Sequence, residues 1–255
     1  IHPWAEMVRF TRTGGEANSV AVRIARASTS RHTVAFCGYH GWHDWYLSSN
    51  INNKNNLNNH LMSNLKFSGV SKSLKNTSFP FMYNDLKGLK KIINSKNIGI
   101  IIMEVLRNSV PKNNFLKEVR KICNKKNIVL IFDECTSGFR ESLGGKHMAY
   151  KVYPDLAMFG KAIGNGYAIN AIIGKKKFMI KSDKTFVSST FWTERLGSVA
   201  ALATIKYMKK NKSYRFIKSQ GIKIKSMWSK IAIKHNIEID IISMDSIPIF
   251  VFKKH

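Results

Sequence analysis

The sequence has few acidic residues, few cysteines and no long hydrophobic run. Asp and Glu together number 15 against 42 Lys and Arg, which gives a formal net charge of +27 over 255 residues. The three cysteines, Cys37, Cys123 and Cys135, are too few and too scattered for a disulfide framework or a zinc ribbon, and they favour a protein of the reducing cytoplasm. Because no apolar run approaches the ~20 residues that cross a bilayer, the sequence argues against an integral membrane protein.

The excess positive charge is spread along the chain rather than gathered in one segment. RNA-binding modules usually interleave arginine with exposed aromatic residues on one face, and this sequence shows no such pattern. A solvated, lysine-rich surface explains the charge better, so nucleic acid is not an expected partner. Acidic substrates and anionic cofactors also fit this charge.

Hydrophobic periodicity predicts an α/β fold. The predicted elements are, in chain order, a helix over 15–28, strands over 33–36 and 98–105, a helix over 116–123, strands over 128–132 and 168–173, and a helix over 194–209. Two of the strands are continuous apolar runs, which is typical of strands buried on both faces. Such strands, separated by helices, predict a mostly parallel sheet between two helical layers.

The length suits one large domain or two small ones. Residues 1–209 carry the α/β pattern, and the lysine-rich sequence over 210–255 predicts the start of a smaller α+β domain. The asparagine-rich stretch 51–67 predicts a surface loop. The first residue is not methionine, and the strand expected over 246–252 has no partner after it, so we interpret the sequence as an internal piece of a longer protein.

Two short motifs could bind a ligand. Thr13, Gly14 and Gly15 directly precede the first helix, where glycines and unpaired backbone N–H groups can cradle a phosphate. Asp133 and Glu134 follow a buried strand, at the sheet edge where open α/β sheets bind ligands. Each motif taken alone could also be ordinary: a glycine-containing helix start and a capped strand end.

A lysine and an aromatic loop add two further features. Lys161 lies in an apolar, glycine-rich setting (MFGKAIGNG), where loss of water makes a lysine nucleophilic, although a surface lysine before a turn would look the same. The loop GYHGWHD places Tyr39 where it could stack on a planar ligand. A metal site of His40, His43 and Asp44 is a weaker alternative, because no further ligand follows at a typical spacing.

Together these features describe a site for pyridoxal 5′-phosphate (PLP). Its aldehyde needs an amine for a Schiff base, its ring nitrogen needs a carboxylate that keeps it protonated, and its phosphate needs a cradle. Lys161, Asp133 and residues 13–15 could supply the three. At an effective dielectric of about 20, opposite charges ~4 Å apart attract by about 4 kcal/mol, which is enough to hold the proton on the ring.

The motifs also resemble the class III aminotransferases, which include glutamate-1-semialdehyde aminomutase. The resemblance covers residues 7–209 and rests on TGGEAN, GYHGWHD, IFDECTSGFR, PDLAMFGKAIGNGY and SSTFWTERLGSVAALAT. It implies the fold type I architecture of PLP-dependent transferases, a small-molecule amino donor and a carbonyl acceptor. Because Thr190 matches a threonine that such enzymes lend to the neighbouring subunit's phosphate site, it also implies a homodimer with shared active sites.

The resemblance assigns roles to individual residues. Lys161 would form the internal aldimine with PLP and move a proton, and Asp133 would pair with the pyridine nitrogen. Glu104, in MEVLRN where relatives more often have Met-Glu-Pro, is a candidate substrate contact. The other implied cofactor contacts are Thr13, Gly14, Gly15, Tyr39, His40, Thr190 and Cys135, which stands where many relatives have valine behind the ring.

Several alternatives stay open at this point. The reaction could be amino transfer between two substrates or the intramolecular amino shift of an aminomutase. The chain could also be a catalytically silent relative, or one that binds anionic polymers. The variants GWHDW and SSTFWTER look closest to family members from sugar- or polysaccharide-synthesis loci.

Overall fold

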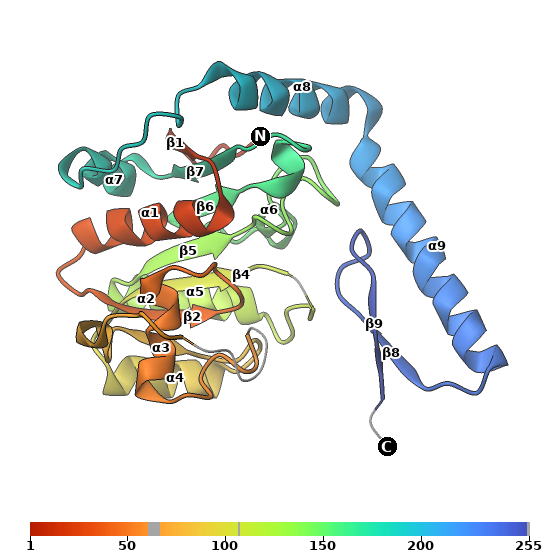
Figure 1. The fold of residues 1–255 in the computed structure, drawn as a ribbon, viewed down its shortest axis with the longest axis horizontal. Coiled ribbons are helices and arrows are strands. Elements are labelled where there is room, and N and C mark those ends of the chain that lie inside the picture. The colour runs from red at the N-terminus through yellow and green to blue at the C-terminus, as the bar shows by residue number, and fades with distance from the viewer. Residues whose placement is uncertain (61–66, 107, 254–255) are drawn as a thin grey trace.

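The computed structural model describes residues 1–60, 67–106 and 108–253, and a seven-stranded sheet lies at its centre (Figure 1). The sheet has the order β1-β7-β6-β5-β4-β2-β3, and β7 runs antiparallel to both neighbours while the other adjacent pairs are parallel. This confirms the predicted α/β class and mostly parallel sheet. The strands are β1 (Met7–Thr11), β2 (Thr33–Cys37), β3 (Ser78–Pro80), β4 (Ile98–Glu104), β5 (Val129–Asp133), β6 (Leu156–Phe159) and β7 (Asn170–Gly174).

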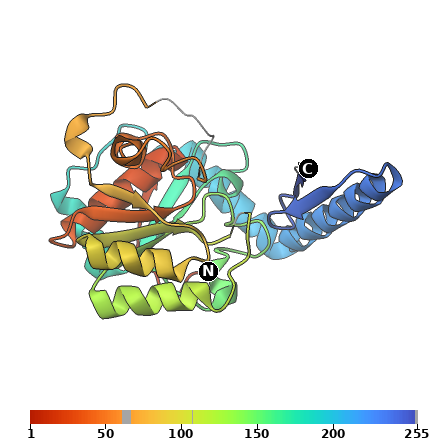
Figure 2. The ribbon, with the colours of Figure 1, turned by 90° about the horizontal axis from the view of Figure 1, so that it is seen from below.

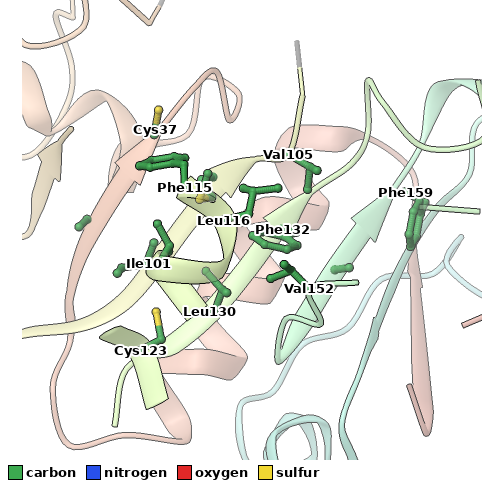
Figure 3. Close-up of a cluster of buried hydrophobic side chains, with 14 of the residues drawn as sticks. Cys37, Ile101, Val105, Phe115, Leu116, Cys123, Leu130, Phe132, Val152 and Phe159 are labelled. Carbon is green, nitrogen blue, oxygen red and sulfur yellow. The ribbon is translucent and has the colours of Figure 1, made fainter. Parts of the chain in front are cut away.

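Helices cover both faces of this sheet. α1 (Gly14–Ala27) lies on one face, and α4 (Leu86–Ser95) and α5 (Phe115–Lys126) lie on the other (Figure 2). β4 is buried along its whole length. Its successive side chains point to opposite faces of the sheet, and helices cover both faces. Ile100 and Ile102 pack in the cluster on the α1 side, whereas Ile101 and Met103 pack in the cluster on the α5 side (Figure 3).

Helix α1 begins where the sequence indicates. Thr13 is its N-cap and forms a capping box with Glu16, in which the Thr13 hydroxyl accepts from the Glu16 N–H and the Glu16 carboxylate accepts from the Thr13 N–H. Ala17, Ala21 and Ala25, spaced four residues apart, are fully buried. Their small side chains allow the helix to lie close to the sheet, which fixes the position of its N-terminus at the sheet edge.

Short helical segments connect these elements. They are α2 (Asp44–Leu47), α3 (Ser49–Asn52), η1 (Lys72–Leu74), α6 (His147–Tyr150), η2 (Lys161–Ile163), α7 (Lys176–Met179) and η3 (Ile180–Lys184). The expectation of a surface loop over 51–67 is wrong for part of that stretch, because Leu57 is fully buried in the cluster on the α1 side. Residues 61–66 lie outside the described residues.

The C-terminal part begins with a helix packed against the sheet domain and then extends away from it (Figure 1). It consists of α8 (Arg195–Asn211), α9 (Ser213–Lys234), β8 (Ile239–Ile242) and β9 (Ile249–Phe252). The last strand was expected to have no partner after it, and β9 instead pairs antiparallel with β8, the short strand that precedes it. The domain boundary near residue 210 stays a prediction. None of the helices in the described ranges is long and apolar enough to cross a bilayer.

Candidate active site

A cavity of about 540 Å³ opens at the carboxyl end of β5, beside the N-terminus of α1. It lies where ligands bind in open α/β sheets. Seven of the predicted site residues line it, drawn from segments far apart in the sequence: Thr13, Gly14, Gly15, Tyr39, Asp133, Cys135 and Lys161. The residues predicted to act together therefore share one cavity.

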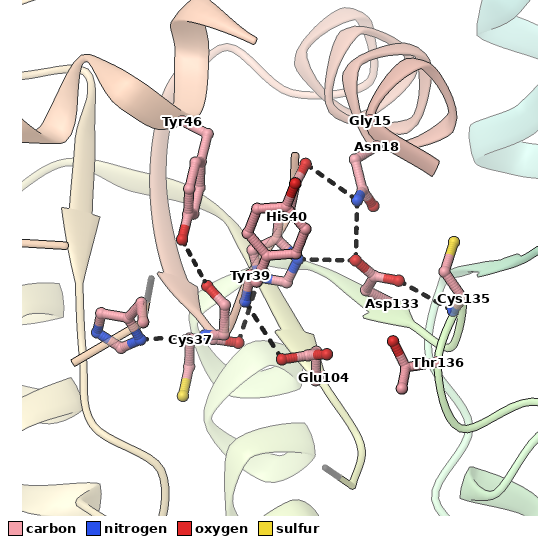
Figure 4. A network of polar contacts seen from close by, with 12 residues as sticks. Gly15, Asn18, Cys37, Tyr39, His40, Tyr46, Glu104, Asp133, Cys135 and Thr136 are labelled. Carbon is pink, nitrogen blue, oxygen red and sulfur yellow. Dashed lines mark hydrogen bonds and ion pairs between the residues drawn. The ribbon is translucent and has the colours of Figure 1, made fainter. Parts of the chain in front are cut away.

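Asp133 is the last residue of β5 and is only 4% exposed (Figure 4). Its Oδ2 accepts a hydrogen bond from Asn18 Nδ2 at 2.8 Å and lies 2.9 Å from His40 Nδ1, and its Oδ1 accepts from the Cys135 N–H at 3.0 Å. Burial alone would raise the pKa of this carboxyl, but these contacts outweigh it and hold the pKa below the ordinary value of 3.8. Asp133 is thus a buried carboxylate that keeps its negative charge at neutral pH.

His40 lies behind Asp133 and does not line the cavity. Its Nδ1 lies 2.9 Å from Oδ2 of Asp133, and its Nε2 lies 3.2 Å from the carbonyl oxygen of Cys37. The structure therefore places this predicted cofactor contact as a support of Asp133. Across the described residues, no group of three or more His, Cys, Asp or Glu side chains is placed to hold a metal ion.

Cys135 forms the cavity wall next to the start of α1. A Cβ atom added to Gly14 would lie 3.5 Å from the Cys135 Sγ, and that sulfur lies 3.7 Å from Oδ1 of Asn170. Burial and the neighbouring Asp133 carboxylate raise the pKa of the Cys135 thiol well above its ordinary value. A neutral thiol at this place fills space against a ligand and is not a nucleophile.

Glu134 points away from the cavity and anchors the following loop. Its carboxylate accepts from the Ser137 hydroxyl at 2.7 Å, the Lys146 N–H at 2.7 Å, and both the N–H and Nδ1 of His147 at 2.9 and 2.6 Å. His147 Nε2 accepts from the Trp4 indole N–H at 2.9 Å, so its proton is on Nδ1. Burial opposes ionisation, but these donors lower the pKa of Glu134 from its ordinary 4.5.

Replacing Glu134 with Gln should destabilise the fold by about 3–5 kcal/mol, because the amide NH₂ would face N–H donors inside the protein. The pKa of Glu134 is lower in the folded protein than in the unfolded chain. The contribution of Glu134 to the stability of the fold is therefore fully present above pH 4.5 and is lost as the pH falls through the pKa of the folded state. Urea unfolding between pH 3 and 7 measures both effects. Glu118→Gln is the control, because Glu118 pairs with Lys121 at an exposed site. Equal losses in the two variants would contradict this account.

Lys161 follows β6 and begins the short helix η2. Its backbone adopts a left-handed conformation with φ of 48°, which is uncommon for a residue with a side chain. Its Nζ donates to the hydroxyl of Thr136 at 2.8 Å. Lys161 lines the same cavity as Asp133 and also borders a second cavity, of about 780 Å³, beneath α8. An amine and a carboxylate thus face one space.

Glu104 and Tyr39 meet beneath the aromatic loop. Glu104 ends β4 opposite Asp133 in the sheet register, and its Oε2 accepts from the Tyr39 N–H at 3.2 Å. Between them, Gly38 has a φ of 112°, and a Cβ there would lie 2.5 Å from Oε2 of Glu104. Glu104 does not line the 540 Å³ cavity, and it supports the aromatic loop through the Tyr39 N–H. Its predicted contact with a substrate stays a prediction.

Thr190 is exposed and lies outside the cavity, in the segment between η3 and α8. Two contacts tie this segment to the start of α1. The Trp192 indole N–H donates to Oε1 of Glu16 at 3.0 Å, and Arg12 forms an ion pair with Glu194. Thr190 itself lies two residues before Trp192 on this segment and does not line the cavity.

Sequence reasoning missed two residues of this site. Asn18 lies four residues after Gly14, on the same face of α1, and its amide donates both to Asp133 and to the carbonyl of His40. Helical spacing from the glycines could have indicated it. Thr136 holds the Lys161 amine, but a threonine three residues after a strand-end aspartate carries no sequence signal.

Sequence comparison with known proteins identifies the family of this chain. The family model for class-III aminotransferases matches residues 1–243. The chain belongs to this family. It is 34% identical to the 3-aminobutyryl-CoA aminotransferase of Cloacimonas acidaminovorans over 261 residues, covering 99% of this chain and 59% of that protein. It is 37% identical to the glutamate-1-semialdehyde 2,1-aminomutase of Sulfolobus acidocaldarius over 215 residues, covering 82% and 50%.

Solved structures of other proteins share the fold of this chain. The FumI protein of Sphingopyxis sp. MTA144, in its PLP internal aldimine form, superposes with a TM-score of 0.86 at 22% identity, covering 98% of this chain and 59% of that one. An ω-transaminase from Sphaerobacter thermophilus gives 0.80 at 24% identity, covering 94% and 57%. The predicted PLP-transferase fold is thus confirmed. The chain spans between half and three fifths of the length of these relatives.

Proposed function

We propose that this class-III chain binds PLP in the 540 Å³ cavity and transfers an amino group between an amino donor and a carbonyl acceptor. The observation that carries the proposal is the shared cavity. The Lys161 amine and the ionised Asp133 carboxylate both face it, next to the N-terminus of α1. An amine, a buried anion and a helix N-terminus are what the aldehyde, the ring nitrogen and the phosphate of PLP require.

The residues present fit this cofactor. By helix geometry the N–H groups of Gly14 and Gly15 have no partner within α1, so they are available to a phosphate. Asn18 and His43 each leave one buried polar atom, Oδ1 and Nδ1, without a hydrogen-bond partner in the described structure. Tyr39 borders the cavity with a side chain 37% exposed, placed to cover a flat ring. When bound, PLP supplies an electron sink for the carbon next to the substrate nitrogen.

The chain's own residues perform three tasks in this proposal. Asp133 presents a fixed negative charge, held by Asn18, His40 and the Cys135 N–H, that keeps a ring nitrogen protonated. Lys161 moves a proton at its Nζ atom, as a general acid and base. The Thr136 hydroxyl, 2.8 Å from that nitrogen, keeps the amine inside the cavity.

Two reaction classes use such a site, and relatives of both kinds match the chain. A relative named as an aminotransferase matches 99% of the chain, which supports transfer between two substrates. The intramolecular amino shift is the second candidate, supported by the aminomutase that is 37% identical. The two are separated by whether one compound is isomerised or a second carbonyl compound is consumed.

We also propose a homodimer in which Thr190 contributes to the partner's phosphate site. Thr190 is exposed, lies outside its own cavity, and sits on a segment tied to the start of α1 by Trp192 and Glu194. Residues 1–209 would form the PLP-binding domain and 210–255 the start of the smaller one. The three free, buried cysteines support a cytoplasmic location.

The test begins with cofactor binding. We expect the chain to retain PLP through dialysis, and borohydride reduction followed by peptide mass spectrometry should place the pyridoxyl group at Lys161. Incubation with a panel of amino donors and carbonyl acceptors should then convert a donor to its carbonyl product. Reduction at any other lysine would overturn the assignment. Retained PLP without conversion of any donor would indicate a catalytically silent relative.

A further inference from the structure

The second cavity, of about 780 Å³ beneath α8, shares Lys161 with the cavity proposed for the cofactor. Within the described ranges, Lys161 is the only residue that lines both. Much of the wall of the second cavity is apolar or aromatic, and it includes Phe139, Tyr167, Ala203, Tyr207, Met208 and Ile217. The amine of Lys161 therefore stands between the cofactor cavity and a second, largely apolar one.

The charges in this second cavity are all positive. Among the described residues that line it, Arg140 and Lys161 are the only charged ones, and none is acidic. Arg140 is half-buried, and burial lowers the pKa of its guanidinium from the ordinary value. Because arginine nevertheless keeps its proton in proteins, the cavity holds a positive charge with no anion beside it.

Most of the Arg140 guanidinium is available to a ligand. Its Nε donates to the carbonyl oxygen of Thr136 at 2.8 Å, which orients the planar group. Its two terminal nitrogens have no hydrogen-bond or ion-pair partner in the described part of the chain, and neither nitrogen is fully buried. The remaining N–H donors can therefore be reached from the cavity.

Thr136 holds both cations in one arrangement. Its carbonyl oxygen accepts from Arg140 Nε at 2.8 Å, and its hydroxyl accepts from Lys161 Nζ at 2.8 Å. Because the two oxygens belong to one residue, the two nitrogens lie within about 10 Å of each other. A molecule of a few carbon atoms spans that distance, so one small substrate can contact both side chains.

A half-buried guanidinium without a partner favours the binding of an anion. Charged groups taken out of water are usually paired, because an unpaired charge loses its solvation without compensation. The planar fork of an arginine matches the two oxygens of a carboxylate and forms two parallel hydrogen bonds with it. The exposed rings of Tyr167 and Tyr207 in the same wall offer apolar surface to the carbon chain of such a ligand.

We propose that Arg140 is a substrate-binding residue that holds a carboxylate of the amino donor while Lys161 acts on the carbon that bears the nitrogen. This inference rests on the proposed function and names its substrate class. The donors are amino acids whose carboxylate reaches Arg140 and whose carbon chain lies along the second cavity. Amines of the same length without a carboxylate are poor donors.

Chemical labelling tests the contact without any substitution. Phenylglyoxal, which modifies arginine, is added to the full chain with and without PLP, and peptide mass spectrometry locates the modified residues. The probes are glycine, β-alanine, 4-aminobutanoate, 5-aminopentanoate and 6-aminohexanoate, each with the alkylamine of the same length, and inorganic phosphate. We expect at least one amino acid to protect Arg140 while its alkylamine and phosphate do not. Arg215, at an exposed position of α9, should be modified equally throughout.

Two variants measure the contribution of Arg140. With the amino acid that protects best and its alkylamine, dissociation constants are measured by equilibrium dialysis, and kcat and KM are measured with PLP bound. We expect Arg140→Met to weaken binding of the amino acid about tenfold or more, the range for a lost hydrogen bond to a charged group, and to leave the alkylamine unchanged. Arg140→Lys should recover part of the loss, because it keeps the charge but not the fork. Arg215→Met is the matched control.

The outcomes for Arg140 and for the cofactor are separable. Protection of Arg140 by no amino acid, equal protection by the alkylamines, or stronger protection by phosphate would overturn the proposal for Arg140. So would equal losses for the amino acid and the alkylamine in Arg140→Met. A wild-type chain that binds no PLP would overturn the proposed function, and the labelling result would still decide whether Arg140 binds a carboxylate.

Discussion

Replacing Lys161 with alanine should abolish covalent retention of PLP and lower amino-transfer activity by about 10²–10⁴-fold or more, the range in which a positioned acid–base group contributes. The reason is geometric. Lys161 Nζ is held in the cavity by the Thr136 hydroxyl, and it is the only lysine among the described residues that line this cavity. Substrate turnover, and pyridoxyl labelling after borohydride reduction, measure the two effects.

Lys209→Ala, in the last turn of α8, is the matched control and should keep both activity and labelling. A small primary amine added to Lys161→Ala should recover part of the activity, because the truncated side chain leaves room for a diffusible base. Unchanged turnover in Lys161→Ala would contradict the assignment of this lysine. So would labelling that survives the substitution.

Asp133→Asn should lower activity by about 10³-fold, which corresponds to losing about 4 kcal/mol of charge attraction at an effective dielectric of about 20. Asparagine keeps the shape but not the charge. Its NH₂ group would also face a donor, because Asn18 and the Cys135 N–H donate to different carboxylate oxygens. We therefore expect a lower melting temperature as well. Activity per folded molecule and thermal unfolding measure the two effects separately.

Asp155→Asn is the control that separates the loss of charge at the site from the general loss of stability when a buried aspartate is replaced. Asp155 is 3% exposed and pairs with Arg120 and Lys175, at the opposite end of the strands from the cavity. Its substitution should lower stability while PLP affinity stays close to the wild-type value. If Asp133→Asn retained full activity per folded molecule, Asp133 would not be the partner of the ring nitrogen.

The elements that the sequence predicted are those whose pattern is local. The run IGIIIME is apolar at almost every position and forms the fully buried β4, and Thr13 followed by Glu16 marks the start of α1. β1 and β6 were missed for different reasons. β1 alternates between half-buried and exposed residues, and it joins the sheet by pairing with β7, which is distant in the sequence. β6 is only four residues long and directly precedes the lysine motif.

In the candidate site too, local features were predictable and contacts between distant segments were not. Asp133 and Lys161 were predicted to share a site from residue type and from a strand end, and they do line one cavity. The supporting contacts were not predictable, because each joins distant segments. Asn18 reaches Asp133 across 115 residues, and Thr136 reaches Lys161 across 25. His40 shows the limit of motif reasoning, since the same sequence fits a cofactor contact and a residue behind the aspartate.

The pairing of β1 with β7 has a consequence for the order of folding. Met7 lies opposite Gly174, so β1 has no strand to pair with in this sheet until synthesis has passed β7. Residues 13–15, which we propose as the phosphate cradle, follow β1 closely. Contacts of such high sequence separation form slowly, because the chain must close a long loop first. Nascent chains that end before Gly174 should therefore be unable to form the cofactor site that we propose, however well their central strands have assembled.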